Sequence, residues 1–341
     1  MFTLRQYLLA LLDSRGLTRT LGEIDVCRDE QGRPCFSAGN SAAVFRIRLG
    51  GRIRSLRCYL RPMRHLKEIY GQRLLEKELY LHTSPETGVW VDTVLGDWIE
   101  GSTLHETVAQ AAALRDRESL QILVRLFDRL ALALVTDDRA HGDLKPENII
   151  VGDDGTLCPI DFDASYLPAF AGEISPELGT AAYQHPARTA ADFDERIDDY
   201  PAALISTALH ALAENPTLWD RYGSSDGLLY TPQRIASDPA YRETLALFEK
   251  RGMAVQYRIA QLLTAPTLRL FGLAELLAEA VREKPAARSG TEAETPELFV
   301  ENGLWGYHTP EQVVVPPLYD CGFDFTEGLA AVRVGQAWHY I

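Results

Sequence analysis

Cysteine is scarce in this chain of 341 residues, and the few cysteines form no motif. The five thiols are scattered between Cys27 and Cys321, their number is odd, and no two stand in a C-x-x-C pair. Disulfide frameworks and zinc sites need paired or closely spaced cysteines. The sequence therefore argues against both and favours a reducing, cytoplasmic location.

Long apolar runs are also absent, since no stretch of 18 consecutive apolar residues occurs. Even ILVRLFDRLALALV (122–135) is interrupted by charged side chains. The N-terminal apolar run, Tyr7 to Leu12, has six residues and is too short for a signal peptide or a membrane span. We expect a soluble protein in which residues 1–29 form a short amphipathic helical extension.

Basic residues are outnumbered, with 34 Lys and Arg against 48 Asp and Glu and a formal net charge of −14. Nucleic-acid-binding domains usually show the opposite imbalance, so no nucleic-acid partner is expected, and nothing indicates a membrane partner. The imbalance is uneven, because residues 1–95 hold 15 basic and 10 acidic side chains. A basic front part beside an acidic remainder suggests an anionic ligand held near the front.

The first third of the chain has the sequence pattern of a β-sheet. Residues 34–62 contain short β-prone runs, two of which are separated by Gly50-Gly51, a hairpin signal. Residues 63–78 are compatible with a helix, and two further strands are expected around residues 84–88 (SPETG).

From about residue 103 the apolar spacing becomes helical. A small strand-rich lobe at about 30–96 is therefore expected to precede a larger helical lobe at about 97–282. Residues 283–298 are polar, rich in Ala, Pro and Glu, and predict a linker before an aromatic, Gly-rich segment at 299–341.

Asp143, Asn148 and Asp161 carry the strongest chemical signal. They lie on two loops that an expected hairpin joins, and their oxygen atoms suit Mg²⁺, which is usually held by one or two carboxylates together with substrate phosphates. Lys145 could meet the charge of a phosphoryl group. The alternative for these residues is an acidic surface turn.

Three segments here resemble protein-kinase motifs in order. Residues 141–148 (HGDLKPEN) resemble the catalytic loop H-R-D-L-x-x-x-N, and residues 161–163 (DFD) resemble D-F-G. Residues 179–186 (GTAAYQHP) are similar to the G-T-x-x-Y-x-x-P segment of Ser/Thr kinases. The resemblance covers about residues 30–280 and implies an α+β, bilobal protein-kinase-like fold with a small β-rich N-lobe and a larger helical C-lobe. The protein-kinase-like domain is placed at 30–282.

The same resemblance implies roles for five residues. Asp143 would be the catalytic base, Lys145 would contact the γ-phosphate of ATP, and Thr180 would hydrogen-bond both. Asn148 and Asp161 would hold Mg²⁺.

The front lobe matches the kinase pattern less well. Residues 37–44 (SAGNSAAV) occupy the place of G-x-G-x-x-G-x-V, so Gly39 and Val44 are the expected ATP contacts of a thinned glycine loop. Arg57 stands where the phosphate-anchoring strand lysine is expected, and no lysine precedes Lys67. An arginine can bind phosphate through its planar fork, and the alternative is a surface-strand arginine.

Two further predictions concern the surroundings of ATP. The carboxylate partner of Arg57 is expected from the following helix, with Glu68 favoured over Glu76. Residues 95–104 resemble the segment that runs past the adenine, so the backbone of Asp97 and Ile99 would bind the base.

Three other residues bear on activity. Gly142 replaces the arginine of most protein kinases, which excludes switching by loop phosphorylation through that side chain. Asp163 replaces the glycine of D-F-G and is either a surface substitution or a charge that alters metal binding. Asp198 matches the aspartate that braces the catalytic-loop backbone.

The C-terminal segment resembles one bacterial WG repeat. Trp305 and Trp338 are 33 residues apart, and such units normally stack in groups of about three or more. We expect a small β-rich WG-repeat appendage that packs on the kinase-like lobe or comes from a longer array. It would contact a protein partner or have no binding role.

Three functions remain open at this point. The first is an ATP- and Mg²⁺-dependent Ser/Thr protein kinase that acts on a protein substrate. The second is a pseudokinase scaffold or nucleotide-gated binding module. It is favoured by Arg57, Asp163 and the thinned glycine loop. The third is a small-molecule kinase of the aminoglycoside-phosphotransferase type, which the H-G-D spelling favours.

Overall fold

A computed structural model describes two compact units of the chain. The described residues are 1–152, 155–282, 296–301, 303–310, 312–323, 325, 330–334 and 337–341. The first unit, the strand unit, comprises residues 1–99 with 162–165, and the second comprises residues 100–161 with 166–341. Most of the predicted linker at 283–298, and parts of the predicted WG-repeat segment, lie outside the described residues.

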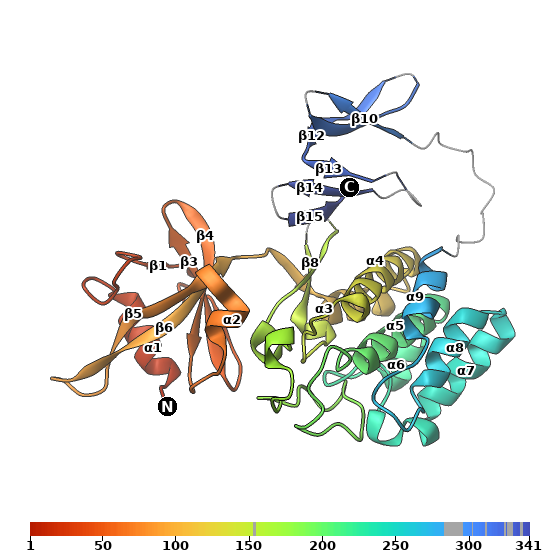
Figure 1. The fold of residues 1–341 in the computed structure, drawn as a ribbon, viewed down its shortest axis with the longest axis horizontal. Coiled ribbons are helices and arrows are strands. Elements are labelled where there is room, and N and C mark those ends of the chain that lie inside the picture. Colours follow the sequence, from red (N-terminus) through yellow and green to blue (C-terminus); the bar gives the residue numbers. More distant parts are fainter. Residues whose placement is uncertain are drawn as a thin grey trace. The chain divides into compact units, whose positions relative to one another are not determined.

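The strand unit is built on one six-stranded antiparallel sheet (Figure 1). The strand order is β1-β3-β4-β6-β5, and β2 also pairs with β3. The strands are β1 (Asp25–Val26), β2 (Phe36–Ala38), β3 (Ala42–Leu49), β4 (Arg52–Tyr59), β5 (Leu74–His82) and β6 (Gly88–Asp97).

The predicted hairpin between β3 and β4 is confirmed. Leu49 pairs with Arg52, which leaves a two-residue turn of Gly50 and Gly51 with φ values of 56° and 81°. Two central residues with positive φ define the turn type that matches the twist of an antiparallel pair, and glycine adopts this conformation without steric cost.

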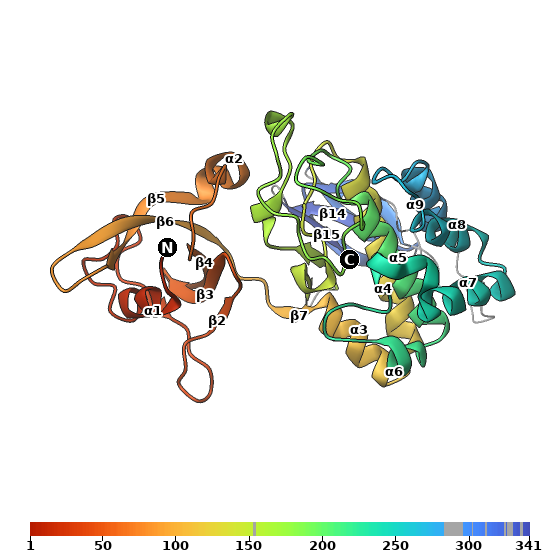
Figure 2. The same cartoon turned by 90° about the horizontal axis from the view of Figure 1, so that it is seen from below.

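The N-terminal helix α1 (Leu4–Leu12) belongs to the core of the strand unit. Thr3 and Gln6 form a capping box at its start. Tyr7 and Leu11 are fully buried among the inward-facing residues of the sheet, and Figure 2 shows the helix beside it. The predicted amphipathic helix is therefore present, and it completes the sheet's apolar face.

The helix expected over residues 63–78 is much shorter than predicted. Helix α2 (Leu66–Tyr70) has five residues and is followed by one 3₁₀ turn, η1 (Gly71–Arg73). Gly71 adopts a φ of 53°, which ends the helix, and β5 begins directly afterwards. Burial of the leucines of β5 against the core favours the strand.

The second unit contains a helical part and a small sheet of three short strands, ordered β7-β8-β9. These strands are β7 (Gly101–Thr103), β8 (Ile149–Gly152) and β9 (Leu157–Pro159). The α-helices are α3 (Leu104–Ala113), α4 (Arg117–Thr136), α5 (Asp199–Glu214), α6 (Leu218–Tyr222), α7 (Pro239–Arg251), α8 (Ala254–Leu262) and α9 (Leu273–Arg282). In addition to η1, the described residues contain the 3₁₀ turns η2 (Pro146–Asn148), η3 (Phe162–Ala164), η4 (Pro168–Phe170) and η5 (Pro232–Ser237).

Helices α4 and α5 pack against each other at the centre of the helical part. Both had been expected from their apolar spacing, and α5 is buried along almost its whole length. A buried carboxylate lies between them: Asp128 accepts a hydrogen bond of 2.6 Å from Ser206 and lies 2.8 Å from Nε2 of His210.

The C-terminal residues form two three-stranded antiparallel sheets. Their strands are β10 (Glu297–Glu301), β11 (Leu304–His308), β12 (Val313–Tyr319), β13 (Cys321–Gly322), β14 (Ala331–Val334) and β15 (Ala337–Tyr340). Tyr307 is fully buried in their core and donates a hydrogen bond of 2.8 Å to the carbonyl of Phe323. The segment is thus β-rich, and its identity as a WG repeat stays a prediction.

The mixed α+β architecture, with a curved sheet followed by helices, is compatible with a bilobal protein-kinase-like fold. Among the residues that the structure describes, no helix has the length and apolar character needed to cross a membrane. The predicted domain boundaries remain predictions.

Candidate active site

A short hairpin brings the two predicted metal-binding segments together. Strands β8 and β9 pair so that Ile149 lies opposite Pro159, and the amide of Ile160 donates a hydrogen bond of 2.8 Å to the carbonyl of Asn148. Asp161 follows at once. The loop that carries Asn148 and the segment that carries Asp161 are therefore neighbours in one unit, as the sequence predicts.

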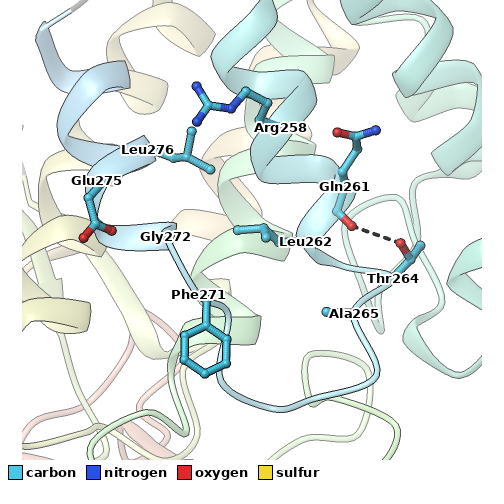
Figure 3. Close-up of a pocket in the computed structure, with 9 residues that line it drawn as sticks. All are labelled: Arg258, Gln261, Leu262, Thr264, Ala265, Phe271, Gly272, Glu275 and Leu276. Carbon is cyan, nitrogen blue, oxygen red and sulfur yellow. Dashed lines mark hydrogen bonds between the residues drawn. The ribbon is translucent and has the colours of Figure 1, made fainter.

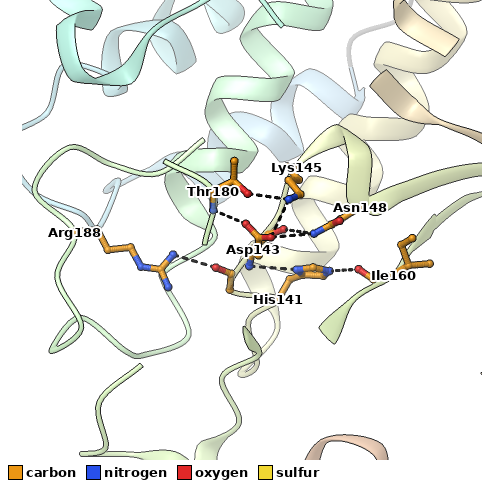
Figure 4. A network of polar contacts seen from close by, with 8 residues as sticks. His141, Asp143, Lys145, Asn148, Ile160, Thr180 and Arg188 are labelled. Carbon is orange, nitrogen blue, oxygen red and sulfur yellow. Dashed lines mark hydrogen bonds and ion pairs between the residues drawn. The ribbon is translucent and has the colours of Figure 1, made fainter. Parts of the chain in front are cut away.

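Asp143 is the centre of a polar network (Figure 4). Its Oδ1 accepts a hydrogen bond of 2.6 Å from the amide of Thr180, and its Oδ2 lies 3.2 Å from Nζ of Lys145. Lys145 in turn donates to the Thr180 hydroxyl at 2.8 Å. The three residues predicted to act together are brought together.

Asp143 also orients the side chain of Asn148. Its Nδ2 donates to the carbonyl of Asp143 at 2.9 Å and to Oδ2 of Asp143 at 3.2 Å, so its oxygen Oδ1 faces away from Asp143. Asp161 adopts a φ of 69°, a conformation that is uncommon outside glycine and concentrates at functional sites.

One amide oxygen and one carboxylate fit Mg²⁺ that arrives with a nucleotide, because the phosphates supply further oxygen ligands. Within the described part of the chain, no three His, Cys, Asp or Glu side chains converge on a metal site.

The backbone of the loop is braced by the predicted Asp198. This side chain is 1% exposed and accepts hydrogen bonds from the amides of His141 and Gly142, the latter at 3.0 Å. Burial raises the pKa of Asp198. His141 accepts from the Asp143 amide through Nδ1 at 3.4 Å, and its Nε2 lies 2.8 Å from the carbonyl of Ile160, which favours the Nε2–H tautomer.

Arg188 braces the loop from another side, and the sequence motifs give no sign of it. Its Nη1 donates to the carbonyl of Gly142 at 3.1 Å and to Gln184. The residue is 9% exposed, and burial lowers the pKa of its guanidinium although Asp198 and Asp143 oppose the shift. A buried cation is thus supplied beside Gly142, where the kinase pattern has an arginine.

In the strand unit, Arg57 lies on β4 opposite Val44. Its side chain is 14% exposed, and Nη1 lies 2.5 Å from Oδ2 of Asp163. The other oxygen of Asp163 accepts hydrogen bonds from the hydroxyl groups of Tyr59 at 3.1 Å and Tyr70 at 2.6 Å. Burial also raises the pKa of Tyr59.

These contacts correct two predictions. The ion pair of Arg57 is formed with Asp163 instead of a helix glutamate, since Glu68 is exposed and Glu76 lies 3.7 Å from Lys67. Asp163 is only 3% exposed, so it is not a surface substitution. A carboxylate that is buried this deeply needs a cation and hydrogen-bond donors, and the strand provides both.

Three other predicted nucleotide contacts lie at or beyond the ends of strands. Gly39 is in the β2–β3 hairpin, where its amide donates to the carbonyl of Ala42 at 2.9 Å. Asp97 ends β6, and its carbonyl accepts from the Ser55 hydroxyl at 3.0 Å. Ile99 is half-buried and ends the first segment of the strand unit. Their contacts with ATP stay predictions.

A separate hollow of about 410 Å³ lies in the helical part and is lined by α8 and the start of α9 (Figure 3). Arg258, Phe271 and Glu275 are among its lining residues. None of the predicted site residues lines it, so it has no part in the assignment below.

Comparison with known proteins places this geometry in context. Over 172 residues, 48% of the chain, it is 28% identical to CBL-interacting protein kinase 17 of Oryza sativa subsp. japonica. Over 113 residues, 31% of the chain, it is 34% identical to the serine/threonine-protein kinase PknL of Mycobacterium tuberculosis. The similarity is to serine/threonine protein kinases.

This similarity is weak and partial. The matched segments span 35% of the rice protein and 27% of the mycobacterial one. No protein-family model matches the chain. The comparisons thus support a kinase-like relationship.

Proposed function

We propose that this chain is an ATP- and Mg²⁺-dependent phosphotransferase of the Ser/Thr protein kinase type. The observation that carries the proposal is the network in which Thr180, Lys145 and Asn148 all bond to Asp143. The partial similarity to two proteins named as protein kinases, one of them as a serine/threonine-protein kinase, supports it.

Phosphoryl transfer needs positioning and charge stabilisation more than covalent chemistry from the protein. Oδ1 of Asp143 accepts a hydrogen bond from the Thr180 amide, which fixes the orientation of the carboxylate that would face a substrate hydroxyl. Asp143 would orient that hydroxyl and accept its proton as the oxygen attacks phosphorus. Lys145 would neutralise charge on the transferring group.

Asn148 and Asp161 would hold Mg²⁺, which when bound neutralises charge on the ATP phosphates. Arg57 would contribute a second cation toward phosphate. Gly39, Val44, Asp97 and Ile99 would contact the nucleotide.

A pseudokinase is the second candidate, and the Arg57–Asp163 ion pair favours it. A guanidinium that is already paired with a buried carboxylate has less charge to offer an incoming phosphate. This chain would then serve as a nucleotide-gated or scaffolding module.

Transfer of labelled phosphate from ATP to protein separates these functions. We expect wild type to label protein with Mg²⁺ present, and Asp143→Asn to label at least about 100-fold more slowly because the base is lost. Asp226→Asn, which changes an exposed aspartate, is the matched control and should act like wild type. Equal rates in wild type and Asp143→Asn would contradict the proposal.

Two other outcomes point to the alternatives. Binding of MgATP without any transfer would indicate the pseudokinase. Labelling of small hydroxyl compounds without protein labelling would indicate a small-molecule kinase.

A further inference from the structure

The carboxylate that holds Arg57 does not come from a helix. Helix α2 has five residues, and the glutamate favoured from the sequence, Glu68, is exposed on it. What α2 contributes is Tyr70, whose hydroxyl donates to Asp163. Asp163 itself lies on the 3₁₀ turn η3, two residues after the predicted metal ligand Asp161.

We propose that Asp163 is a positioning residue, which orients the Arg57 guanidinium for the phosphates of MgATP in the role expected of a helix glutamate. The inference rests on the proposed function. It adds that the orientation of the phosphate-binding cation, Arg57, depends on the chain segment that follows Asp161.

The contacts of Asp163 suit this role. One oxygen lies 2.5 Å from Arg57, and the other accepts from two tyrosine hydroxyl groups, so the carboxylate cannot turn without losing bonds. A guanidinium carries five N–H donors, which lets one edge hold a carboxylate while another binds phosphate. Pairing and phosphate binding are therefore compatible.

The position of Asp163 in the chain adds a regulatory consequence. Because two peptide units separate it from Asp161, any rearrangement of η3 that withdraws Asp163 from β4 also displaces the chain next to the metal ligand. Helix α2 reaches η3 through the Tyr70 hydroxyl, and Leu66, Ile69 and Phe162 pack on the same apolar cluster as the Tyr70 ring.

Calorimetric titration with MgATP tests the proposal without relying on turnover. We expect Asp163→Asn and Arg57→Gln each to weaken binding about tenfold or more, as loss of a partner in a buried charge pair does. The double variant should bind no more weakly than Arg57→Gln, because Asp163 acts through Arg57. Glu68→Gln is the matched control and should stay within about twofold of wild type, as expected of an exposed charge.

A second variant guards against misfolding of Asp163→Asn. Tyr70→Phe keeps both charges and removes one hydrogen bond to Asp163, so we expect a loss of about two- to fivefold, smaller than in Asp163→Asn because the ion pair with Arg57 remains. Thermal unfolding of every variant checks that the strand unit remains folded.

Three results would overturn the proposal. If Glu68→Gln binds MgATP more weakly and Asp163→Asn binds it like wild type, then Glu68 of the helix, and not Asp163, orients Arg57. Tighter binding by Asp163→Asn would show that Asp163 competes with phosphate. No binding of MgATP by wild type would refute the proposed function and this role with it, whereas normal wild-type binding that Asp163→Asn leaves unchanged would refute only the role.

Discussion

Gly179 shows how a single residue controls the surroundings of the Asp143 carboxylate. It adopts a φ of 72°, and a Cβ atom there would lie 2.7 Å from the carbonyl oxygen of Gly142 and 3.0 Å from Oδ1 of Asp143. The absence of a side chain therefore allows the segment that carries Thr180 to approach the loop closely enough for the amide of Thr180 to bond Asp143.

We expect Gly179→Ala to destabilise the protein and to slow phosphate transfer. Gly172→Ala is a matched control, because Gly172 has a φ of 86° and open space around its Cβ position. Gly172→Ala should lower the free energy of unfolding by about 1 kcal/mol, because it introduces backbone strain alone. Gly179→Ala should lower it by about 1–3 kcal/mol more. Urea unfolding and transfer rates measure both effects, and equal losses in the two variants would contradict the explanation.

Asp199 makes stability depend on pH. It begins α5, accepts a hydrogen bond of 3.2 Å from the amide of Leu270 and is 3% exposed. Burial raises its pKa from 3.8 to about 6. Because the folded state binds the proton more tightly than the unfolded state, the free energy of unfolding falls as pH rises through this window.

We expect Asp199→Asn to remove this dependence. The difference in the free energy of unfolding between wild type and the variant should change by at most about 3 kcal/mol between pH 4 and pH 7. The change should favour the variant at pH 7. Denaturant unfolding at several pH values measures it. A difference that does not change over this range, or that favours wild type as pH rises, would show that burial does not perturb this carboxyl.

At the scale of elements, local patterns determine most of the fold. The β3–β4 hairpin follows from two adjacent glycines, and α4 and α5 follow from apolar spacing. Helix α2 is the exception, because residues 74–82 pair with β6 and bury Leu79 and Leu81. Pairing with the next strand and burial of the two leucines outweighed a local preference for helix.

The packing of α4 on α5 depends on a buried polar contact as well as on apolar area. Asp128 is 3% exposed and serves Ser206 and His210 at once. We expect Asp128→Ala to reduce the free energy of unfolding by about 2–4 kcal/mol, since the buried Ser206 and the half-buried His210 lose their acceptor.

Thermal or urea unfolding measures this effect, and the exposed Asp226→Asn serves again as the control. A loss in Asp128→Ala no larger than in the control would show that the carboxylate is dispensable to the helix pair.

At the scale of the whole molecule, the candidate site divides into a part that could be predicted and a part that could not. The network of Asp143, Lys145 and Asn148 comes from one continuous loop, so a short motif is sufficient to find it. Arg57 and Asp163 are 106 positions apart in the sequence. Only folding brings their side chains together, and no local pattern marks the pair.

The central proposal is that Asn148 and Asp161 would hold magnesium that arrives with ATP. The two residues lie on adjoining segments of one unit, and Asn148 is turned so that its amide nitrogen serves Asp143. The distribution of charge is consistent with an anionic ligand, since residues 1–95 carry a basic excess in an otherwise acidic chain.

The most direct test is the Mg²⁺ dependence of ATP binding, measured by calorimetry with and without a chelator in wild type and in Asp161→Asn. The account predicts that wild type binds ATP about tenfold or more tightly when Mg²⁺ is present, and that Asp161→Asn loses this gain because the metal loses its carboxylate. Wild-type affinity that is the same with and without Mg²⁺, or a gain that survives in Asp161→Asn, would contradict it.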